Sequence, residues 1–238
     1  MRLIDADLVG ADLRRANLQQ ADLSDANLAG ANLQDARLSE ASFRGAYFGN
    51  PNLTTEGVTD RERDRRFDEN LPEAADLRRA NLSKADLTGA NLQRTNLHRA
   101  NLSGATLVDA DLTLSNLGNA NLSQANLQGA DLLRAQLRNA DLSLANLTNA
   151  NLSGAFLHNA SLRDANLTDA ILRPVRLEPG FVARLDYADL TQANLTRVDL
   201  REANLPFTVL KRADLTQANL RAANFQCADV QQANFQEA

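Results

Sequence analysis

The residue types that most often do chemistry in proteins are few and scattered in this chain. The two histidines, His98 and His158, each directly follow a leucine and lie far apart in the sequence. The single cysteine, Cys227, cannot form an internal disulfide, and no cysteine spacing typical of a zinc site occurs. The carboxylates occupy single places in a repeated pattern, whereas acid–base catalysis needs them paired in a desolvated cleft. With no glycine-rich phosphate loop and no nucleophile–base arrangement, we predict no catalytic site, no metal site and no cofactor.

Composition and charge narrow the class of protein further. The 238 residues carry a net charge of −5, with 44% hydrophobic residues, 4% aromatic residues and no tryptophan. The hydrophobic content is too high for a disordered chain, and nothing is basic enough to predict nucleic-acid binding. The repeat begins almost at Met1, which leaves no room for a signal peptide, and no apolar run could span a membrane. We expect a cytoplasmic protein that binds neither nucleic acid nor membranes, unless the chain is a domain of a longer protein.

The elements that position these residues follow from an internal repeat of five residues. Leu or Phe recurs at this spacing from Leu3 to Leu53, from Leu77 to Leu177 and from Leu185 to Phe235. The residue two places earlier is usually Ala, and the residue between them is usually Asn or Asp. We therefore read one domain over residues 1–238, with repeats at 1–55, 75–179 and 183–237, an insertion at about 56–74 and an irregularity at about 178–184.

An extended backbone can use a five-residue period, and an α-helix cannot. Five residues advance about 500° around a helix, so successive leucines would be offset by about 140° and would form no common face. Along an extended chain alternate side chains share one side, so Ala and Leu point inward while their neighbours point outward. If the remaining residue turns a corner, four repeats close a square coil of about 20 residues, and neighbouring coils pair about 4.8 Å apart. The sequence thus predicts an all-β solenoid.

This coil fixes which outward residues share a column. His98 and His158 lie in one column three coils, or about 14 Å, apart, which is too far for one metal ion whose ligands lie at about 2 Å. Asn126, Asn146 and Asn166 form another column, in which we expect the amides to hydrogen-bond from coil to coil.

Three stretches of sequence carry a resemblance to a known family. Ala11-Asp12-Leu13, Ala16-Asn17-Leu18 and Ala120-Asn121-Leu122 resemble the pentapeptide-repeat family, and the Ala-(Asp/Asn)-Leu form is most similar to its cyanobacterial members. The resemblance implies a right-handed quadrilateral β-helix. Some members of the family resemble duplex DNA in size and charge and protect or inhibit type II topoisomerases.

The insertion has no five-residue period and carries a net charge of −3 out of the total of −5. Thr59 and Glu62 resemble a capping box at the start of a short helix, and Pro72 would oppose its continuation. One interpretation is a projecting loop that recognises a protein partner, and the other is a solvated insertion without a role. Its candidate interaction residues are Asp60, Glu62, Asp64, Arg65, Arg66 and Phe67.

Apolar residues interrupt the polar outward positions near the end of the chain. Tyr187, Phe207 and Cys227 recur at the period of one predicted coil, so they should stack on one column. We interpret Tyr187 and Phe207 as a surface for a partner or a second copy, since exposed apolar patches mark interaction sites. The alternative is that the two rings pack against each other or on the second irregularity. No capping segment is seen at either end of the repeats, so a homodimer through an exposed solenoid end is a further hypothesis.

These observations favour a non-catalytic structural or protein-interaction module that presents flat polar faces and a projecting loop to a protein partner. The alternative function is a DNA mimic that protects or inhibits gyrase. A mimic should present continuous acidic columns, but the position before Leu is more often Asn than Asp, Arg79 and Arg99 share one column, and the net charge outside the insertion is about −2. An enzyme with an unrecognised surface site is the third interpretation and the weakest.

Overall fold

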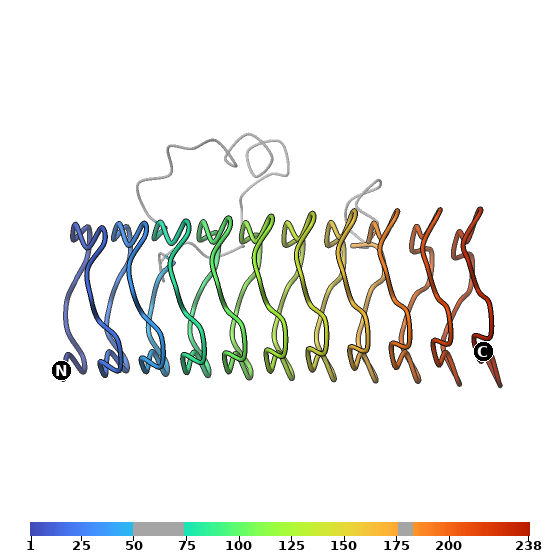
Figure 1. The fold of residues 1–238 in the computed structure, drawn as a ribbon, viewed down its shortest axis with the longest axis horizontal. Helices are drawn as coiled ribbons and strands as arrows, with labels where there is room; N and C mark the ends of the chain where they lie inside the picture. The colour runs from blue at the N-terminus through green and yellow to red at the C-terminus, as the bar shows by residue number, and fades with distance from the viewer. Residues whose placement is uncertain (50–73, 176–182) are drawn as a thin grey trace.

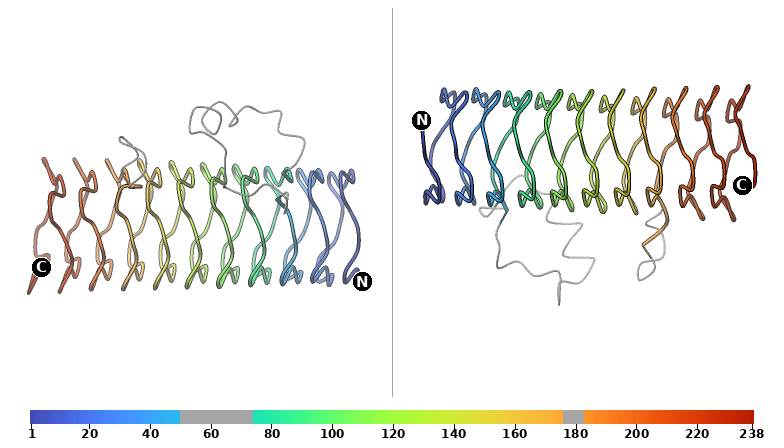
Figure 2. Two further views of the ribbon diagram at one scale, coloured as in Figure 1. Left: turned by 180° about the vertical axis from the view of Figure 1, so that it is seen from behind. Right: turned by 90° about the horizontal axis from the view of Figure 1, so that it is seen from below.

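In the computed structural model, which describes residues 1–49, 74–175 and 183–238, the chain winds into a single row of coils (Figure 1). The N-terminus lies at one end of the row and the C-terminus at the other, and the coils follow chain order between them. Views from behind and from below agree with this arrangement (Figure 2). Each coil therefore contacts only its neighbours, as in other solenoid proteins.

Parallel pairing of equivalent residues in successive coils holds the coils in register. Asn81 pairs with Asn101, and Asn101 pairs with Asn121. Every fifth residue pairs in the same way, so each coil has four sides. Each side contributes a single pairing residue, and the described ranges contain no continuous strand or helix. The structure thus has the four-sided coil that the repeat predicts, and the right-handed sense of the coil stays a prediction.

Five positions recur in each repeat: a flanking Ala, a pairing residue, a central Leu and two outward residues that form the corner. The central amide of Leu122 donates to the carbonyl of Asp141 in the next coil at 2.7 Å, and the second outward amide, of Gln124, donates to Ser143 O at 2.9 Å. The next flanking amide, of Ala125, closes the corner on Leu122 O at 3.0 Å. The pairing amide bonds in the other direction, to the flanking carbonyl of the preceding coil. Backbone groups thus satisfy every amide except that of the first outward residue.

That remaining amide explains why the pairing residue is Asn or Asp. Asn121 Oδ1 accepts the backbone N–H of Ser123 at 2.9 Å, and Asp131 Oδ1 accepts that of Leu133 at the same distance. Asn and Asp are the side chains that commonly bond the backbone two residues further on. A desolvated amide without an acceptor costs about 1–3 kcal/mol. The pairing position therefore favours these residue types for a local reason, beyond the outward polarity expected from the sequence.

Side-chain amides also link the coils. Asn146 donates to Asn126 Oδ1 at 3.0 Å, as the column of asparagines predicts. Asn166 departs from this ladder, because its amide donates to Thr148 Oγ1 at 2.9 Å instead. The expected ladder is thus present at the first step of this column and is replaced by an amide–hydroxyl bond at the second.

Apart from the corner that contains Pro174, each described corner is a β-turn whose second outward residue has a positive φ. This angle is 65° at Gly104 and 62° at Leu144, and the turn is closed by the bond from the next flanking amide to the central carbonyl. A positive φ at this place alone defines a type II turn. The left-handed conformation costs a non-glycine residue about 1–2 kcal/mol. The stacked coils impose it on non-glycine residues at most of the described corners.

Flanking and central side chains fill the interior. Leu122 is fully buried, as are the central leucines of the other interior coils. Two threonines replace the flanking alanine without leaving a polar atom unsatisfied, since Thr95 Oγ1 donates to Leu92 O at 2.7 Å and Thr208 Oγ1 to Leu185 O at 2.9 Å. Ser115 occupies the same position with a buried Oγ that has no hydrogen-bond partner among the described residues, so the flanking position accepts a small polar group both with and without an acceptor.

Both interruptions of the repeat occur at the same corner of the coil. Tyr47 and Asp76 are the pairing residues before and after the first interruption, and Ile171 and Arg184 those before and after the second. Tyr47 and Ile171 belong to one side of the coil, and Asp76 and Arg184 belong to the next side. The pairing continues past the second interruption, where Phe156 pairs with Arg184. We call this place the interrupted corner.

Changing the side-chain acceptor at the pairing position should change stability in a predictable direction. Asn121→Ala removes the acceptor of the Ser123 amide and should lower the free energy of unfolding by about 1 kcal/mol. Thr106 is a pairing residue that offers no such bond to the Val108 amide, so Thr106→Asn supplies one and should raise the same quantity by about 0.5–1 kcal/mol. Urea denaturation of both variants beside the parent measures the two changes. Destabilisation by both would contradict the role assigned to this bond.

Candidate functional site

An exposed stack of aromatic rings lies on one corner of the later coils. Tyr187 and Phe207 are second outward residues of neighbouring coils, with ring centroids 5.0 Å apart and an interplanar angle of 5°. This spacing follows from the separation of about 4.8 Å between paired backbones. Tyr187 is 52% exposed and Phe207 46%. The rings pack against each other, as one of the alternatives drawn from the sequence expected, and still present about half of their surface to solvent.

A histidine extends the stack onto the preceding coil. The His158 ring meets Tyr187 edge-on, with centroids 5.5 Å apart and an interplanar angle of 79°. His158 Nδ1 shares a hydrogen bond with Oδ2 of the buried Asp186, and Arg184 Nε lies 3.5 Å from Asp186 Oδ1. Asp186 therefore orients the imidazole against the tyrosine. We call His158, Tyr187 and Phe207 the aromatic corner.

The sequence placed part of this cluster correctly and missed the histidine. Tyr187, Phe207 and the exposed Cys227 occupy one column of successive coils, as their regular spacing predicts. His158 was assigned only to the column of His98, because the second interruption separates it in sequence from Asp186, its neighbour in the next coil. The signal that could have found it is that Leu157-His158 and Leu185-Asp186 are equivalent once that interruption is left out.

The other candidate interaction residues lie outside the described residues. They belong to the acidic insertion predicted at 56–74 and are Asp60, Glu62, Asp64, Arg65, Arg66 and Phe67. Leu177 and the greater part of the irregularity predicted at about 178–184 also lie outside them. Roles for these residues in binding stay predictions.

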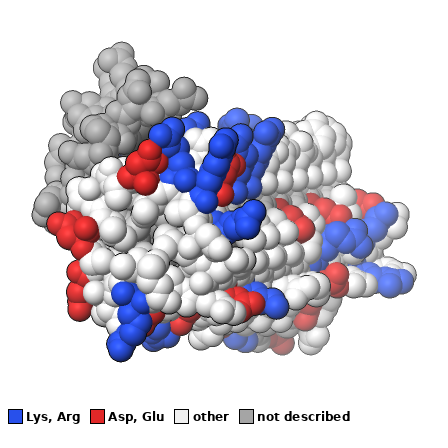
Figure 3. All heavy atoms as spheres, turned by 60° about the vertical axis from the view of Figure 1, so that its left-hand side comes forward, with Lys and Arg blue, Asp and Glu red and all other residues white. Residues whose placement is uncertain are grey.

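Ion pairs between coils neutralise much of the outward charge. Arg79 donates two hydrogen bonds to the Asp35 carboxylate, at 2.7 and 2.9 Å, and Arg197 donates two to Asp169, both at 2.6 Å. Figure 3 shows basic and acidic side chains interspersed on the face in view, with no continuous acidic strip. Exposed pairs of this kind contribute about 0–1 kcal/mol each to stability. Their main consequence is that neither of these two columns is continuously acidic.

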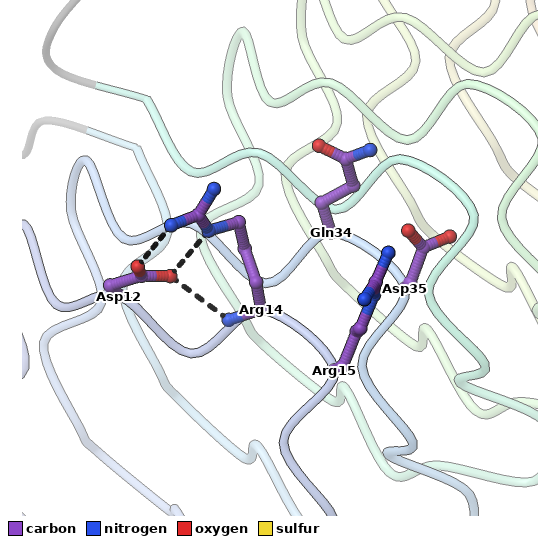
Figure 4. A pocket seen from close by; sticks show the side chains of 5 residues that line it. All are labelled: Asp12, Arg14, Arg15, Gln34 and Asp35. Atoms are coloured by element: carbon purple, nitrogen blue, oxygen red, sulfur yellow. Dashed lines mark hydrogen bonds and ion pairs between the residues drawn. The ribbon is translucent and has the colours of Figure 1, made fainter.

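A polar hollow near the first coils shows the same pairing within one repeat. It is lined by Asp12, Arg14, Arg15, Gln34 and Asp35, and has a volume of about 480 Å³ (Figure 4). Arg14 donates to both oxygens of Asp12, at 2.8 and 2.6 Å. The side-chain hydrogen bond from Arg14 is the main cause that lowers the pKa of Asp12 to about 2. Its two carboxylates are each paired with an arginine, Asp12 with Arg14 and Asp35 with Arg79, so neither is placed as a free acid–base group.

Two carboxylates adjoin in a pairing column on the side that precedes the interrupted corner. Asp131 pairs with Asp111, and burial, followed by a smaller effect of Asp111, raises the pKa of Asp131. Each carboxylate accepts the amide two residues further on, from Thr113 and Leu133, both at 2.9 Å. Asn151 Nδ2 also donates to Asp131 at 3.0 Å. These bonds give both residues the structural role of any pairing residue, so the shifted pKa is a cost of burial and does not by itself indicate catalysis.

No group of three or more His, Cys, Asp or Glu side chains in the described part of the chain is placed to hold a metal ion. No helix in the described ranges is long and apolar enough to cross a membrane. The aromatic corner stands out among the described residues by geometry, because its neighbouring aromatic side chains contact one another and Tyr187 and Phe207 remain exposed.

The repeat and the stacked coils together define the class of protein. The model of the pentapeptide repeats matches the chain in eight copies, over residues 6–45, 21–54, 75–113, 107–143, 115–154, 140–178, 183–217 and 199–237. The chain belongs to the pentapeptide-repeat family. No match was found among curated proteins.

Solved structures of family members are similar to the chain in sequence. HetL, a pentapeptide repeat protein involved in heterocyst differentiation regulation from the cyanobacterium Nostoc, is 35% identical over 98% of this chain and 86% of its own, with a TM-score of 0.36. A protein of the Arabidopsis thaliana thylakoid lumen is 34% identical over 46% of this chain and 70% of its own, with a TM-score of 0.40. A trypsin-treated variant of QnrB1, a plasmid-mediated fluoroquinolone resistance protein, is 18% identical over 94% of this chain and 88% of its own, with a TM-score of 0.35.

The raised pKa of Asp131 predicts how stability depends on pH. In the unfolded chain an aspartate titrates near 3.9, so the parent binds a proton more tightly when folded and loses stability as the pH rises through the folded pKa. Asp131→Asn keeps an acceptor for the Leu133 amide and removes this loss. We therefore expect the variant to be more stable than the parent at pH 7, with a smaller difference near pH 3. Asp141→Asn is the control, and an equal gain at both pH values would contradict the prediction.

Proposed function

We propose that the chain is a non-catalytic protein-interaction module that binds a protein partner through the aromatic corner. The observation that carries the proposal is the pair of stacked rings, Tyr187 and Phe207, each about half exposed in adjacent coils. Aromatic side chains are enriched at the centres of protein interfaces, because they bury a large area and lose little conformational freedom. The Asp186–His158 contact holds the edge of the patch in place before any partner arrives.

The surroundings of the aromatic corner support a role in recognition. The preceding residues of its column, Asn119, Asn139 and Asn159, are polar and small, so the rings begin abruptly at Tyr187. Asn tolerates the positive φ of this position better than Tyr or Phe, so the two rings cost more backbone strain than the asparagines that precede them. HetL, at 35% identity, is involved in the regulation of heterocyst differentiation, which favours a regulatory contact over catalysis. A cytoplasmic location belongs to the same proposal.

Gyrase protection or inhibition by DNA mimicry remains the alternative. The pairs Arg79–Asp35 and Arg197–Asp169 weigh against it, because a mimic should present continuous acidic columns and arginine interrupts these two. We therefore rank it below the interaction module.

Replacing the rings with asparagine tests the proposed surface. Tyr187→Asn with Phe207→Asn continues the asparagine column and should keep the fold, while affinity for the captured partner should fall at least tenfold if both rings lie at the centre of the interface. Leu144→Asn is the matched control, since Leu144 is also a second outward residue and is 57% exposed. The measurement is affinity capture from the native host, followed by a binding titration with the partner identified. Equal affinity of all three proteins would refute the aromatic corner as the binding surface.

A second capture separates the aromatic corner from the insertion. In this bait, residues 56–74 are replaced by two regular repeats. Loss of the partner here, with binding retained by the double asparagine variant, would assign recognition to the insertion instead.

Gyrase supercoiling in the presence of the chain tests the alternative. Because the described outward columns are not continuously acidic, we expect no change in the rate of supercoiling, and no protection from a quinolone, at about 10 µM chain, well above the Kd of a specific complex. Inhibition or protection at that concentration, retained by the double asparagine variant, would favour the mimic over the interaction module.

A further inference from the structure

Arginine residues gather at one corner of four consecutive coils. One column of pairing residues passes through these coils and consists of Asp12, Asn32, Asp76 and Asn96. The two outward residues that follow each of them form the corner, and five of the eight are arginines. We call this set the basic strip, and its members are Arg14, Arg15, Gln34, Asp35, Arg78, Arg79, His98 and Arg99.

The arginines of the strip outnumber the carboxylates that they engage. Three of them form ion pairs with aspartates of the same corner and column, namely Arg14–Asp12, Arg78–Asp76 and Arg79–Asp35. Arg15 and Arg99 are exposed, and neither forms an ion pair within the described ranges of the chain. Among these residues, five arginines against three aspartates leave two positive charges, and Arg15 and Arg99 are the side chains that carry them.

The positive charge of the strip also acts on its histidine. Burial is the main cause that lowers the pKa of His98, and the charges of Arg99 and Arg78 lower it further. A proton on the imidazole is therefore disfavoured by its surroundings and by two nearby guanidinium groups. A surface that repels a positive charge in this way attracts a negative one.

The strip begins in the polar hollow that Figure 4 shows. Arg15 and Asp35 belong to the lining of this hollow, whose volume is about 480 Å³. Asp12 holds the Arg14 guanidinium with two hydrogen bonds, whereas no such bond joins Arg15 to the other residues of the lining. An anionic group in the hollow would be partly removed from water, so its attraction to Arg15 would be stronger than on an open surface.

The length of the strip suits a short extended peptide. Arg15 and Arg99 are three coils apart, which is about 14 Å at 4.8 Å for each coil. Alternate side chains of an extended peptide point to one side and lie about 6.6 Å apart, so three carboxylates on alternate residues span about 13 Å. Duplex DNA is a poorer fit, because it carries a phosphate charge about every 1.7 Å of its axis and a protein that binds it must neutralise several of them.

We propose that the basic strip binds an extended acidic segment of a protein partner. The carboxylates of the segment bind Arg15 at one end of the strip and Arg99 at the other. The strip lies on the same corner of the coil as the aromatic corner, but three asparagines separate Arg99 from Tyr187 in their column. The basic strip is thus a second interaction surface, and it does not depend on the function proposed for the aromatic corner.

Replacing Arg15 and Arg99 tests this assignment. The probe is a fluorescein-labelled peptide of alternating glutamate and serine, about eight residues long, and fluorescence anisotropy measures its binding at up to about 1 mM chain. Arg15→Gln with Arg99→Gln should weaken binding by about fivefold or more, because two charge contacts are lost. Binding to the parent should also weaken as salt is raised from about 0.05 to 0.5 M, because salt screens exposed charges.

Two control variants keep the strip intact. Arg212→Gln with Arg221→Gln removes the same charge from exposed residues on other corners of later coils, so it should bind the peptide as the parent does. Tyr187→Asn with Phe207→Asn should also bind as the parent does. Loss of binding by the ring variant would place the peptide at the aromatic corner and overturn the proposal.

Three further results would contradict the proposal. The first is equal binding by the strip variant and the parent. The second is equal binding of a peptide in which glutamine replaces glutamate, because recognition would then not depend on charge. The third is a thymidine oligonucleotide of the same length that binds the parent about tenfold more tightly than the peptide does, which would assign the strip to nucleic acid.

Discussion

The pairing of backbones in neighbouring coils is the constraint on which the other features of this molecule depend. Because each pairing residue lies opposite its equivalent one coil further on, every position of the repeat meets the same position in the next coil. The small flanking residue, the inward leucine and the left-handed corner all follow from closing a side in a single repeat. The outward columns follow as well, so a single aromatic residue becomes a stack when its equivalent in the next coil is also aromatic.

The coil could be predicted from the sequence because the period of five excludes a helix and the alternation of an extended chain sends Ala and Leu to the same side. Two features of the coil could not be predicted in this way. The bond from the Asn121 side chain to the Ser123 amide and the positive φ of Leu144 concern local hydrogen bonds and dihedral angles. A pattern of apolar and polar residues carries no information on either, so Asn and Asp were explained only by exposure and by ladders.

The aromatic corner likewise contains residues whose positions could be predicted from the sequence and one whose position could not. Tyr187 and Phe207 could be assigned to one column because no interruption lies between them. His158 could not, since the length of chain that leaves the coil before Arg184 has to be known before the register can be continued. The burial of a side chain is harder to predict from the sequence than the column it belongs to. Asp111 and Asp131 share a column because they are one coil apart. The desolvation that raises the pKa of Asp131, however, depends on the residues that surround that side of the coil.

The interrupted corner has a consequence for how such a rod can change during evolution. The pairs that span an interruption, such as Tyr47–Asn91 and Phe156–Arg184, join residues further apart in the chain than the pairs elsewhere, and the columns on either side remain in phase. Residues can therefore be inserted at that corner with the loss of one β-turn. The pairing register of the residues that follow does not change. An insertion at this corner leaves the spacing of the coils and the outward columns unchanged. New segments can therefore be added during evolution without moving residues of an existing binding surface.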